Sequence, residues 1–216
     1  MPGSCSANKR ADVLSGPCCL DVRAIAVEIY LIRHSQVAVA PGLCYGRSDV
    51  ALADSYRDDW KKLYAKLPAA SRVNRIFSSP LSRCQLFAKS LQCCGLRTDS
   101  RLTELNFGHW ELRPWDAVER REFDVWSADI VNQRCPGGES YQDLFQRVCA
   151  FWAECAADRA KDDTVFVVTH SGIIRALLAL ILEMPLEKSL RLAIDFGGVT
   201  KVNFLQDVPI VAYINR

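Results

Sequence analysis

The sequence lacks several features that would point to other classes of protein. Its 216 residues include only three histidines, and the formal net charge is only +2. A nearly neutral chain gives no electrostatic argument for binding nucleic acid or an anionic membrane surface. The longest apolar run, residues 172–182, is much shorter than the ~20 residues of a membrane span and contains Arg175. We therefore expect this run to form a buried helix.

The spacing of metal ligands is also missing. The ten cysteines include the adjacent pairs Cys18–Cys19 and Cys93–Cys94, but no C-x-x-C occurs and few histidines are available as co-ligands. This pattern argues against a zinc site, and a chain of this length needs no disulfide framework to fold. We expect reduced thiols that pack as small hydrophobic side chains. No metal and no cofactor is predicted.

The first 26 residues differ from the rest of the chain. They lack the apolar run of an export signal, and they carry no lipid-anchor motif. We expect residues 1–26 to form a disordered extension and residues 27–216 to form one cytoplasmic domain. Half of all residues are hydrophobic, which is enough for a well-buried core.

Strand patterns alternate with helix patterns along the domain. The expected strands cover 27–32, 75–79 and 163–169, the expected helices cover 54–67, 79–92, 136–156 and the run from 171, and two last strands within 200–214 form a hairpin or edge pair. This alternation predicts an α/β fold, with a mostly parallel central sheet between two helical layers. Residues 105–138, rich in tryptophan and charge, are expected to form a helical or irregular cap.

Two helix starts have recognisable capping residues. Ser79 followed by Pro80 predicts a helix with serine as its N-cap and proline at its first position. Ser140 and Asp143 resemble a capping pair at the start of the helix within 136–156.

Charged and imidazole side chains gather where the expected strands end. Arg33 and His34 follow the first strand, Arg83 lies in the first turn of the helix after the second strand, and His170 follows the strand 163–169. Taken singly, such a histidine is more often structural and such an arginine is more often a surface charge. In parallel sheets, however, ligands bind at the carboxyl ends of the strands. Two histidines and two arginines at that edge, near helix N-termini, favour a site for a phosphate dianion.

These residues belong to motifs that occur in order along the chain: LIRHS, CYGRSD, SSPLSRC, ELNFGHWE and VVTHSGIIR. The set resembles the histidine phosphatase (phosphoglycerate mutase-like) superfamily over roughly residues 27–206. Within it, CYGRSD, SPLSRC, ELNFGHWE and PGGES most resemble the α-ribazole phosphatase branch of cobalamin biosynthesis. The resemblance implies a phosphomonoesterase that needs no metal ion.

The resemblance also implies a role for each matching residue. His34 would attack phosphorus and form a phosphohistidine. Arg33, Arg83 and His170 would bind the phosphate oxygens and stabilise the charge of the transition state. Glu104 would be the general acid that protonates the leaving oxygen, and its carboxylate would then deprotonate the attacking water.

Further contacts are expected around these residues. Ser35, Gln36 and Ser171 are candidate phosphate-binding residues, and Tyr45 and Arg47 are candidate substrate contacts on the opposite side. The family usually has glycine where Ser35 stands and often where Ser171 stands. Glycine allows close backbone approach, but serine is small and can donate a hydrogen bond to phosphate. We therefore expect both serines to be tolerated.

The cap offers two interpretations for its large side chains. Trp110, Trp115, Trp126 and Arg113 could stack on an aromatic leaving group such as the benzimidazole of α-ribazole phosphate. Alternatively, the tryptophans pack the cap against the body of the domain. The sequence leaves this choice open.

Other functions also remain open. A broad-specificity phosphatase, or a phosphatase of another small metabolite, would use the same residues. A phosphoglycerate mutase is less well supported, because RHSQVAVAPGLCYGR does not resemble the longer first motif of mutases. A non-catalytic binding module would be signalled by loss of His34, Arg83, Glu104 or His170, and all four are present. The expected partner is a small phosphomonoester rather than nucleic acid or a membrane, and a homodimer is one open alternative for the oligomeric state.

Overall fold

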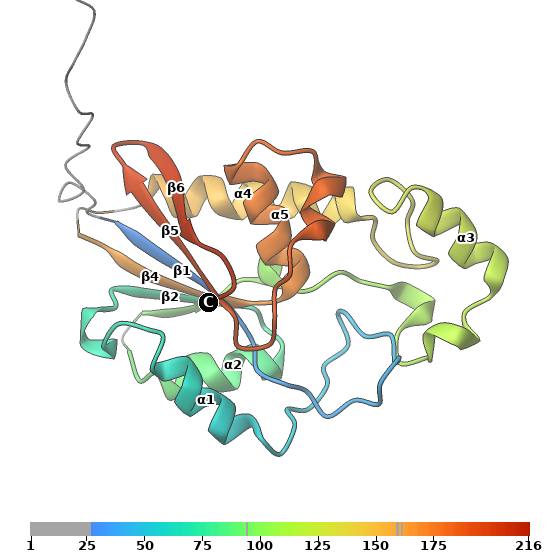
Figure 1. Cartoon of the computed structure of the whole chain (residues 1–216), viewed down its shortest axis with the longest axis horizontal. Coiled ribbons are helices and arrows are strands. Elements are labelled where there is room, and N and C mark those ends of the chain that lie inside the picture. Colours follow the sequence, from blue (N-terminus) through green and yellow to red (C-terminus); the bar gives the residue numbers. More distant parts are fainter. Residues whose placement is uncertain (1–26, 94, 159, 161) are drawn as a thin grey trace, which may run out of the picture.

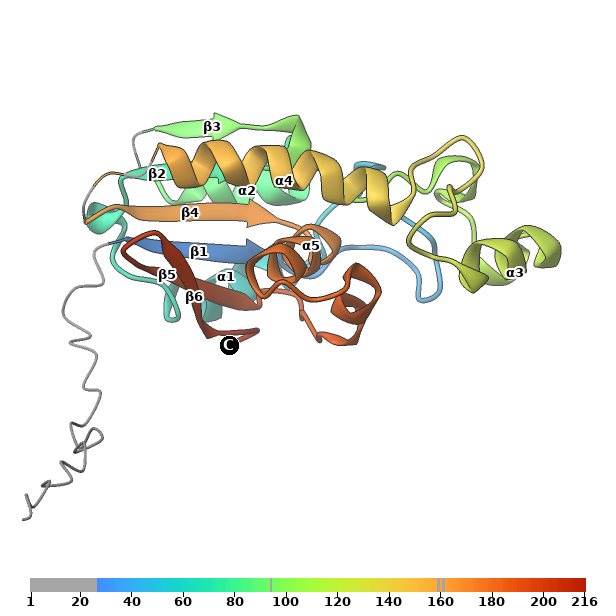
Figure 2. The ribbon, with the colours of Figure 1, turned by 90° about the horizontal axis from the view of Figure 1, so that it is seen from above.

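The structure, a computed structural model, describes residues 27–93, 95–158, 160 and 162–216, so the expectation for residues 1–26 lies outside it. The described residues form a six-stranded sheet with the order β3-β2-β4-β1-β5-β6. Its strands are β1 (Glu28–Arg33), β2 (Arg75–Ser78), β3 (Leu96–Thr98), β4 (Thr164–Thr169), β5 (Val199–Leu205) and β6 (Val208–Tyr213). The first four are parallel, and β5 and β6 form an antiparallel hairpin at one edge (Figure 2). The predicted α/β fold is confirmed.

Burial explains which strands are central. All six residues of β4 are buried, whereas the side chains of β6 alternate between exposed and half-buried, as an edge strand requires. In the β1–β4 register Arg33 lies opposite Thr169. The next residues, His34 and His170, therefore leave the sheet side by side.

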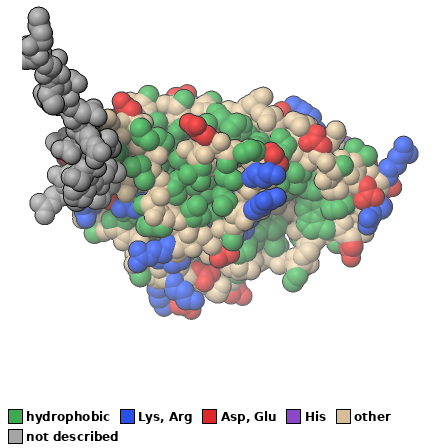
Figure 3. All heavy atoms as spheres, turned by 45° about the horizontal axis from the view of Figure 1, so that its top comes forward, with side chains coloured by type: hydrophobic (Ala, Val, Ile, Leu, Met, Phe, Trp, Pro, Cys, Tyr) green, Lys and Arg blue, Asp and Glu red, His purple; other side chains and the backbone are tan. Residues whose placement is uncertain are grey.

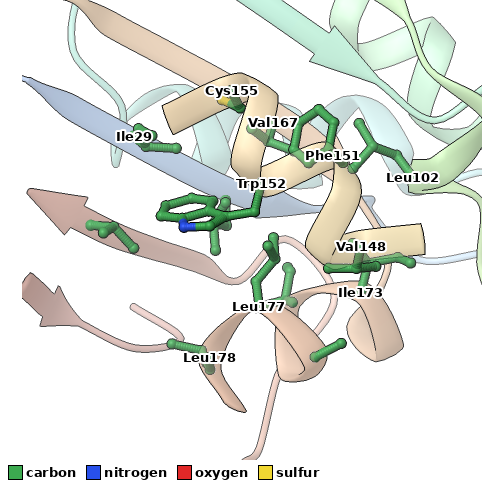
Figure 4. Packing of buried hydrophobic residues seen from close by; sticks show 14 of the residues in the cluster. Ile29, Leu102, Val148, Phe151, Trp152, Cys155, Val167, Ile173, Leu177 and Leu178 are labelled. Carbon is green, nitrogen blue, oxygen red and sulfur yellow. The ribbon is translucent and has the colours of Figure 1, made fainter. Parts of the chain in front are cut away.

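Two helices cover each face of the sheet, as Figure 1 shows. On one face lie α1 (Tyr56–Tyr64) and α2 (Ser82–Ser90), and on the other lie α4 (Tyr141–Ala157) and α5 (Ser171–Ile181). The larger core joins the sheet to α4 and α5, where Val148, Phe151 and Trp152 pack against Ile173 and Leu177 (Figure 4). A second core joins the opposite face to α1 and α2.

A small cap extends beyond the carboxyl ends of the strands (Figure 1). It includes the helix α3 (Arg120–Ala128) and the short 3₁₀ turns η4 (Gly108–Trp110) and η5 (Trp115–Ala117). A third cluster of buried side chains, separate from the two main cores, holds the cap together: Cys44, Trp110, Val118 and Cys135.

The helix starts show one success and one error of the sequence prediction. Ser140 and Asp143 form a complete capping box at the start of α4, as expected. The helix predicted to begin at Ser79 and Pro80 begins instead at Ser82, after an extended Leu81. Asp49, from a distant loop, accepts a hydrogen bond from the Ser82 amide at 2.9 Å and so supplies the cap that the sequence predicts at Ser79. The helix predicted over 54–67 is also shorter than expected and covers Tyr56–Tyr64.

Acidic and basic side chains are interspersed over the face of the molecule that Figure 3 shows. Among the described residues, no helix is both long and apolar enough to cross a membrane.

Candidate active site

His34 lies directly after β1 and is almost completely buried, with 2% of its surface exposed. Its ring Nδ1 lies 2.8 Å from the carbonyl oxygen of the next residue, Ser35. A carbonyl can only accept, so Nδ1 carries the proton and the other ring nitrogen, Nε2, keeps its lone pair. Burial, and then the nearby Arg83 guanidinium, hold the pKa of His34 well below its ordinary value. His34 is therefore a neutral imidazole, the form that can act as a nucleophile.

Two arginines lie beside His34. The guanidinium of Arg33 donates to the carbonyl of Ile194 at 2.6 Å and lies 3.8 Å above the ring of Phe196. Arg83, on α2, is completely buried and donates to the carbonyls of Gly46 and Ser48 at 2.6 and 2.7 Å. The Nε atom of each arginine is buried and has no hydrogen-bond partner among the described residues. Both arginines thus keep an unpaired donor, and both line the cavity described below.

His170, the N-cap of α5, is completely buried, and its ring centre is 5.1 Å from that of His34. Its Nε2 atom lies 2.8 Å from the hydroxyl of Ser79. Burial, and then the neighbouring His34, hold the pKa of His170 well below its ordinary value. The Ser79 side chain, expected to cap a helix, instead contacts this histidine.

Glu104 reaches the same place from the loop after β3. Its carboxylate accepts hydrogen bonds from the Gly172 amide at 3.1 Å and the Ser171 hydroxyl at 3.4 Å. Both donors lie in the first turn of α5, where the helix dipole favours a negative charge. A Cβ atom at Gly172 would lie 2.3 Å from the Glu104 carboxylate, so glycine makes room for the acid. The second serine that replaces a family glycine, Ser171, thus contacts Glu104 through its side chain.

One cavity of about 290 Å³ brings these groups together. Its polar end is lined by Arg33, His34, Arg83, Glu104 and Ser171. Its apolar end is lined by side chains of the cap, of the loop after β1, of α4 and of the 3₁₀ helix Leu186–Arg191: Leu43, Leu105, Phe107, Trp115, Trp126, Ile130, Leu144 and Leu190. Tyr45 also lines the cavity, and its ring lies 5.6 Å from the guanidinium of Arg83 at the polar end. This combination suits a phosphate attached to an apolar or aromatic group.

Four of the predicted contact residues are not among the residues that line the cavity. One is His170, which is completely buried beside His34. Ser35 is buried, and its hydroxyl accepts a hydrogen bond from the Trp60 indole at 3.2 Å rather than lining the cavity. Gln36 is exposed and lines a separate hollow beside α1. Arg47 is exposed and is not among the residues that line the cavity, although its amide donates to Glu111. Of the two substrate contacts expected from CYGRSD, only Tyr45 lines the cavity.

The cap tryptophans pack within the cap, and two of them also line the cavity. Trp110 is buried in the cap, and its indole donates to Glu122 at 3.0 Å. Trp115 and Trp126 stack on each other at 6.1 Å, and both also line the cavity. Arg113 donates to the carbonyl of Ala117 and is not part of the cavity lining.

Sequence reasoning missed two contributors to the site. Arg175 interrupts an apolar run in the sequence, yet it lines the cavity and is oriented by a hydrogen bond to the carbonyl of Leu192 at 2.9 Å. An arginine within an apolar helix was the signal that could have revealed it. Phe196, which contacts His34 and Arg33, lies in a loop without a recognisable pattern.

Comparison with known proteins decides the family. The model of the histidine phosphatase superfamily (branch 1) matches residues 29–216. The protein belongs to the histidine phosphatase superfamily. The family assigned from the sequence motifs is therefore confirmed, and the superfamily accounts for nearly all of the described residues.

Related sequences and related structures carry different names within this superfamily. The "Probable phosphoglycerate mutase GpmB" of Yersinia pestis (strain Pestoides F) is 31% identical over 195 residues, or 86% of this chain and 88% of the relative. The protein of the same name from Salmonella choleraesuis (strain SC-B67) is 29% identical over 82% of this chain and 85% of the relative. The crystal structure of the α-ribazole phosphatase from Shigella flexneri has a TM-score of 0.78 at 23% identity, covering 88% of this chain and 96% of that chain. The structural likeness supports the histidine phosphatase fold.

Proposed function

We propose that the protein is a phosphomonoesterase that acts through a phosphohistidine on His34. The observation that carries the proposal is the neutral His34 imidazole, which lies at one cavity with two guanidiniums and a carboxylate. A nucleophile, groups that bind the phosphate and a proton donor are the parts that phosphoryl transfer needs.

The reaction runs in two displacements. In the first, Nε2 of His34 attacks phosphorus, the ester P–O bond breaks, and Glu104 gives a proton to the leaving oxygen. In the second, water attacks the phosphohistidine and the P–N bond breaks. The Glu104 carboxylate takes the proton of that water, so inorganic phosphate leaves and His34 is restored.

The arginines stabilise the charge that develops on the phosphoryl oxygens. We assign this role to the guanidiniums of Arg33 and Arg83, which line the cavity, and to the imidazole of His170, which lies next to the nucleophile. These groups supply positive charge from the protein itself. The reaction is therefore proposed to proceed without a metal ion.

We propose α-ribazole 5′-phosphate as the substrate. The apolar end of the cavity supports this choice, since Phe107, Trp115 and Trp126 can enclose a flat aromatic leaving group. The second candidate is a phosphoglycerate mutase, which the names of the relatives at 29–31% identity favour. Its substrate is small and anionic and would leave the apolar end of the cavity unused.

Comparing substrates on one enzyme preparation tests both proposals. We expect kcat/KM for α-ribazole 5′-phosphate to exceed that for 3-phosphoglycerate and for p-nitrophenyl phosphate, with no loss of activity in EDTA. Preferential conversion of 3-phosphoglycerate into 2-phosphoglycerate would favour the mutase.

Trapping the phosphoenzyme tests the mechanism. Quenching during turnover should trap acid-labile phosphate on the wild-type protein and none on His34→Ala. Phosphatase activity that survives this substitution would exclude the mechanism. A non-catalytic binding module would form no phosphoenzyme at all.

The remaining expectations from the sequence stay predictions. They are the cytoplasmic location, the small phosphomonoester as the partner instead of nucleic acid or membrane, and the homodimer as an alternative for the oligomeric state.

A further inference from the structure

Ser35 makes two contacts that connect His34 to a helix outside the cavity. Only 1% of its surface is exposed. Its carbonyl oxygen accepts the Nδ1 proton of His34 at 2.8 Å, and its hydroxyl oxygen accepts the indole proton of Trp60 at 3.2 Å. The backbone contact fixes the protonation of the nucleophile. The side-chain contact is one that a glycine at this position could not make.

Trp60 is itself held firmly by other aromatic residues. It lies on α1, and its ring makes T-shaped contacts with Tyr56 and Phe87, with ring centres 4.9 and 5.5 Å apart. Phe87 is completely buried on α2, the helix that also carries Arg83. Both helices lie on the same face of the sheet (Figure 1). The indole therefore connects the backbone next to His34 with the helix that holds one of the phosphate-binding arginines.

We propose that Trp60 is a positioning residue that acts on His34 through Ser35. By holding the Ser35 hydroxyl, the indole fixes the orientation of this residue and hence of its carbonyl. The carbonyl keeps the proton on Nδ1 and leaves the Nε2 lone pair for the attack on phosphorus. This inference rests on the proposed function, because it assigns Trp60 a part in the attack by His34.

A simpler explanation is that the indole N–H of the partly buried Trp60 needs an acceptor and Ser35 provides one. In that case the contact would stabilise the packing of α1 and would not affect His34. The two explanations predict different rate constants when Ser35 or Trp60 is substituted. They also differ in whether the loss from the second substitution adds to the loss from the first.

The first experiment is a double-mutant cycle on the step that forms the phosphohistidine. Ser35→Ala and Trp60→Phe should each lower the single-turnover rate constant about 3–10-fold with less than about a twofold change in KM. The double variant should be no slower than the slower single variant, because both changes break one link. The matched control is Tyr64→Phe, on the same helix as Trp60. It removes the hydrogen bond between the Tyr64 hydroxyl and Ser90 at 2.7 Å and leaves the contact between Trp60 and Ser35 in place. It should lower the melting temperature and leave the rate constant unchanged.

The second experiment reads the histidine directly and does not depend on activity. The chain has only three histidines, so the imidazole nitrogens can be resolved by ¹⁵N NMR and those of His34 assigned with His34→Gln. Wild-type protein and Tyr64→Phe should show His34 with its proton on Nδ1, whereas Ser35→Ala and Trp60→Phe should show a mixture of both tautomers. An unchanged tautomer in these two variants would overturn the inference, as would rate losses that multiply in the double variant or that equal those of Tyr64→Phe. If the wild-type protein forms no phosphohistidine, the proposed function fails, while the NMR result still decides the role of Trp60.

Discussion

The two ends of the cavity are built in different ways. At the polar end, His34 and Arg83 are almost completely buried, and backbone carbonyls fix their side chains. His170 is buried beside His34 without lining the cavity, and it contacts the Ser79 hydroxyl. At the apolar end, Trp115 and Trp126 are only partly buried and are held mainly by contacts with other aromatic side chains of the cap. The polar end lies at the carboxyl edge of the sheet, whereas most residues of the apolar end come from the cap.

This difference predicts that the sheet edge carries out the phosphoryl transfer and that the cap determines which substrate is preferred. The sheet edge presents the groups that any phosphomonoester needs, in a geometry fixed by the register of β1 and β4. In the proposed reaction the cap contacts the leaving group, and we expect its side chains to tolerate changes without disturbing the sheet. Substitutions at the polar end should therefore reduce activity toward every substrate, and substitutions in the cap should change the ranking of substrates.

Replacing Glu104 with glutamine should have the largest effect on activity. Glutamine cannot give up a proton, so kcat/KM for an alkyl phosphate, which reports the first displacement, should fall about 10²–10³-fold. The loss in kcat/KM for p-nitrophenyl phosphate should be about tenfold or less, because that leaving group needs little protonation. The ratio of the two losses is the measurement, and equal losses would contradict the role of Glu104 as the acid.

Replacing Arg83 with lysine should lower kcat/KM about 100-fold for large and small substrates alike. Lysine keeps the charge but lacks the planar guanidinium, which donates to the carbonyls of Gly46 and Ser48 while Arg83 lines the cavity. Arg47→Lys is the control, since Arg47 is exposed outside the cavity and its replacement should change kcat/KM less than about twofold. If the effect of Arg83→Lys were confined to one substrate, the proposed division between the two ends would be wrong.

Removing the Trp126 side chain should raise KM about tenfold for an aromatic leaving group and leave acetyl phosphate unaffected. The matched control is Phe123→Ala, because Phe123 contacts both Trp115 and Trp126 but does not line the cavity. Equal effects of Trp126→Ala on both substrates would mean that the cap also shapes the phosphate end.

The smallest expected effect is on stability. The pKa values of His34 and His170 are lowered in the folded protein, so the unfolded chain binds protons first as the pH falls below about 6.5. The free energy of unfolding should therefore decrease between about pH 7 and pH 5, by up to about 1.4 kcal/mol per pH unit for each histidine. Denaturant titrations should show a shallower decrease for His34→Gln. His109→Gln is the control, since it removes an exposed histidine of the cap and leaves the buried pair intact.

The sequence predicted the polar end well because a simple rule governs it. Parallel strands end at a common edge, so residues that follow β1 and β4 must meet there even though they are far apart in the chain. The same rule does not predict the positions of side chains that depend on contacts between loops and helices far apart in the sequence. The cap of α2 comes from Asp49, which no local pattern indicates, and the partner of Ser35 is a tryptophan 25 residues away.

The apolar end was harder to predict for a related reason. The sequence shows that tryptophans are frequent in the cap, but not which of them face the cavity. Trp110 and Trp115 are only five residues apart, yet one is buried within the cap and the other lines the cavity. That choice depends on how α3 packs against the loops around it, which is a tertiary property.

Because Gly172 has no side chain, the variant Gly172→Ala offers a way to slow the second displacement selectively. A methyl group there would occupy space that the Glu104 carboxylate now fills, while the backbone of α5 and the place of His34 would be unchanged. Gly172→Ala should still accept phosphate from a donor with a good leaving group but release it slowly, because the base that activates water would be displaced. The phosphohistidine on His34 would then accumulate, so this variant would allow the proposed intermediate to be isolated.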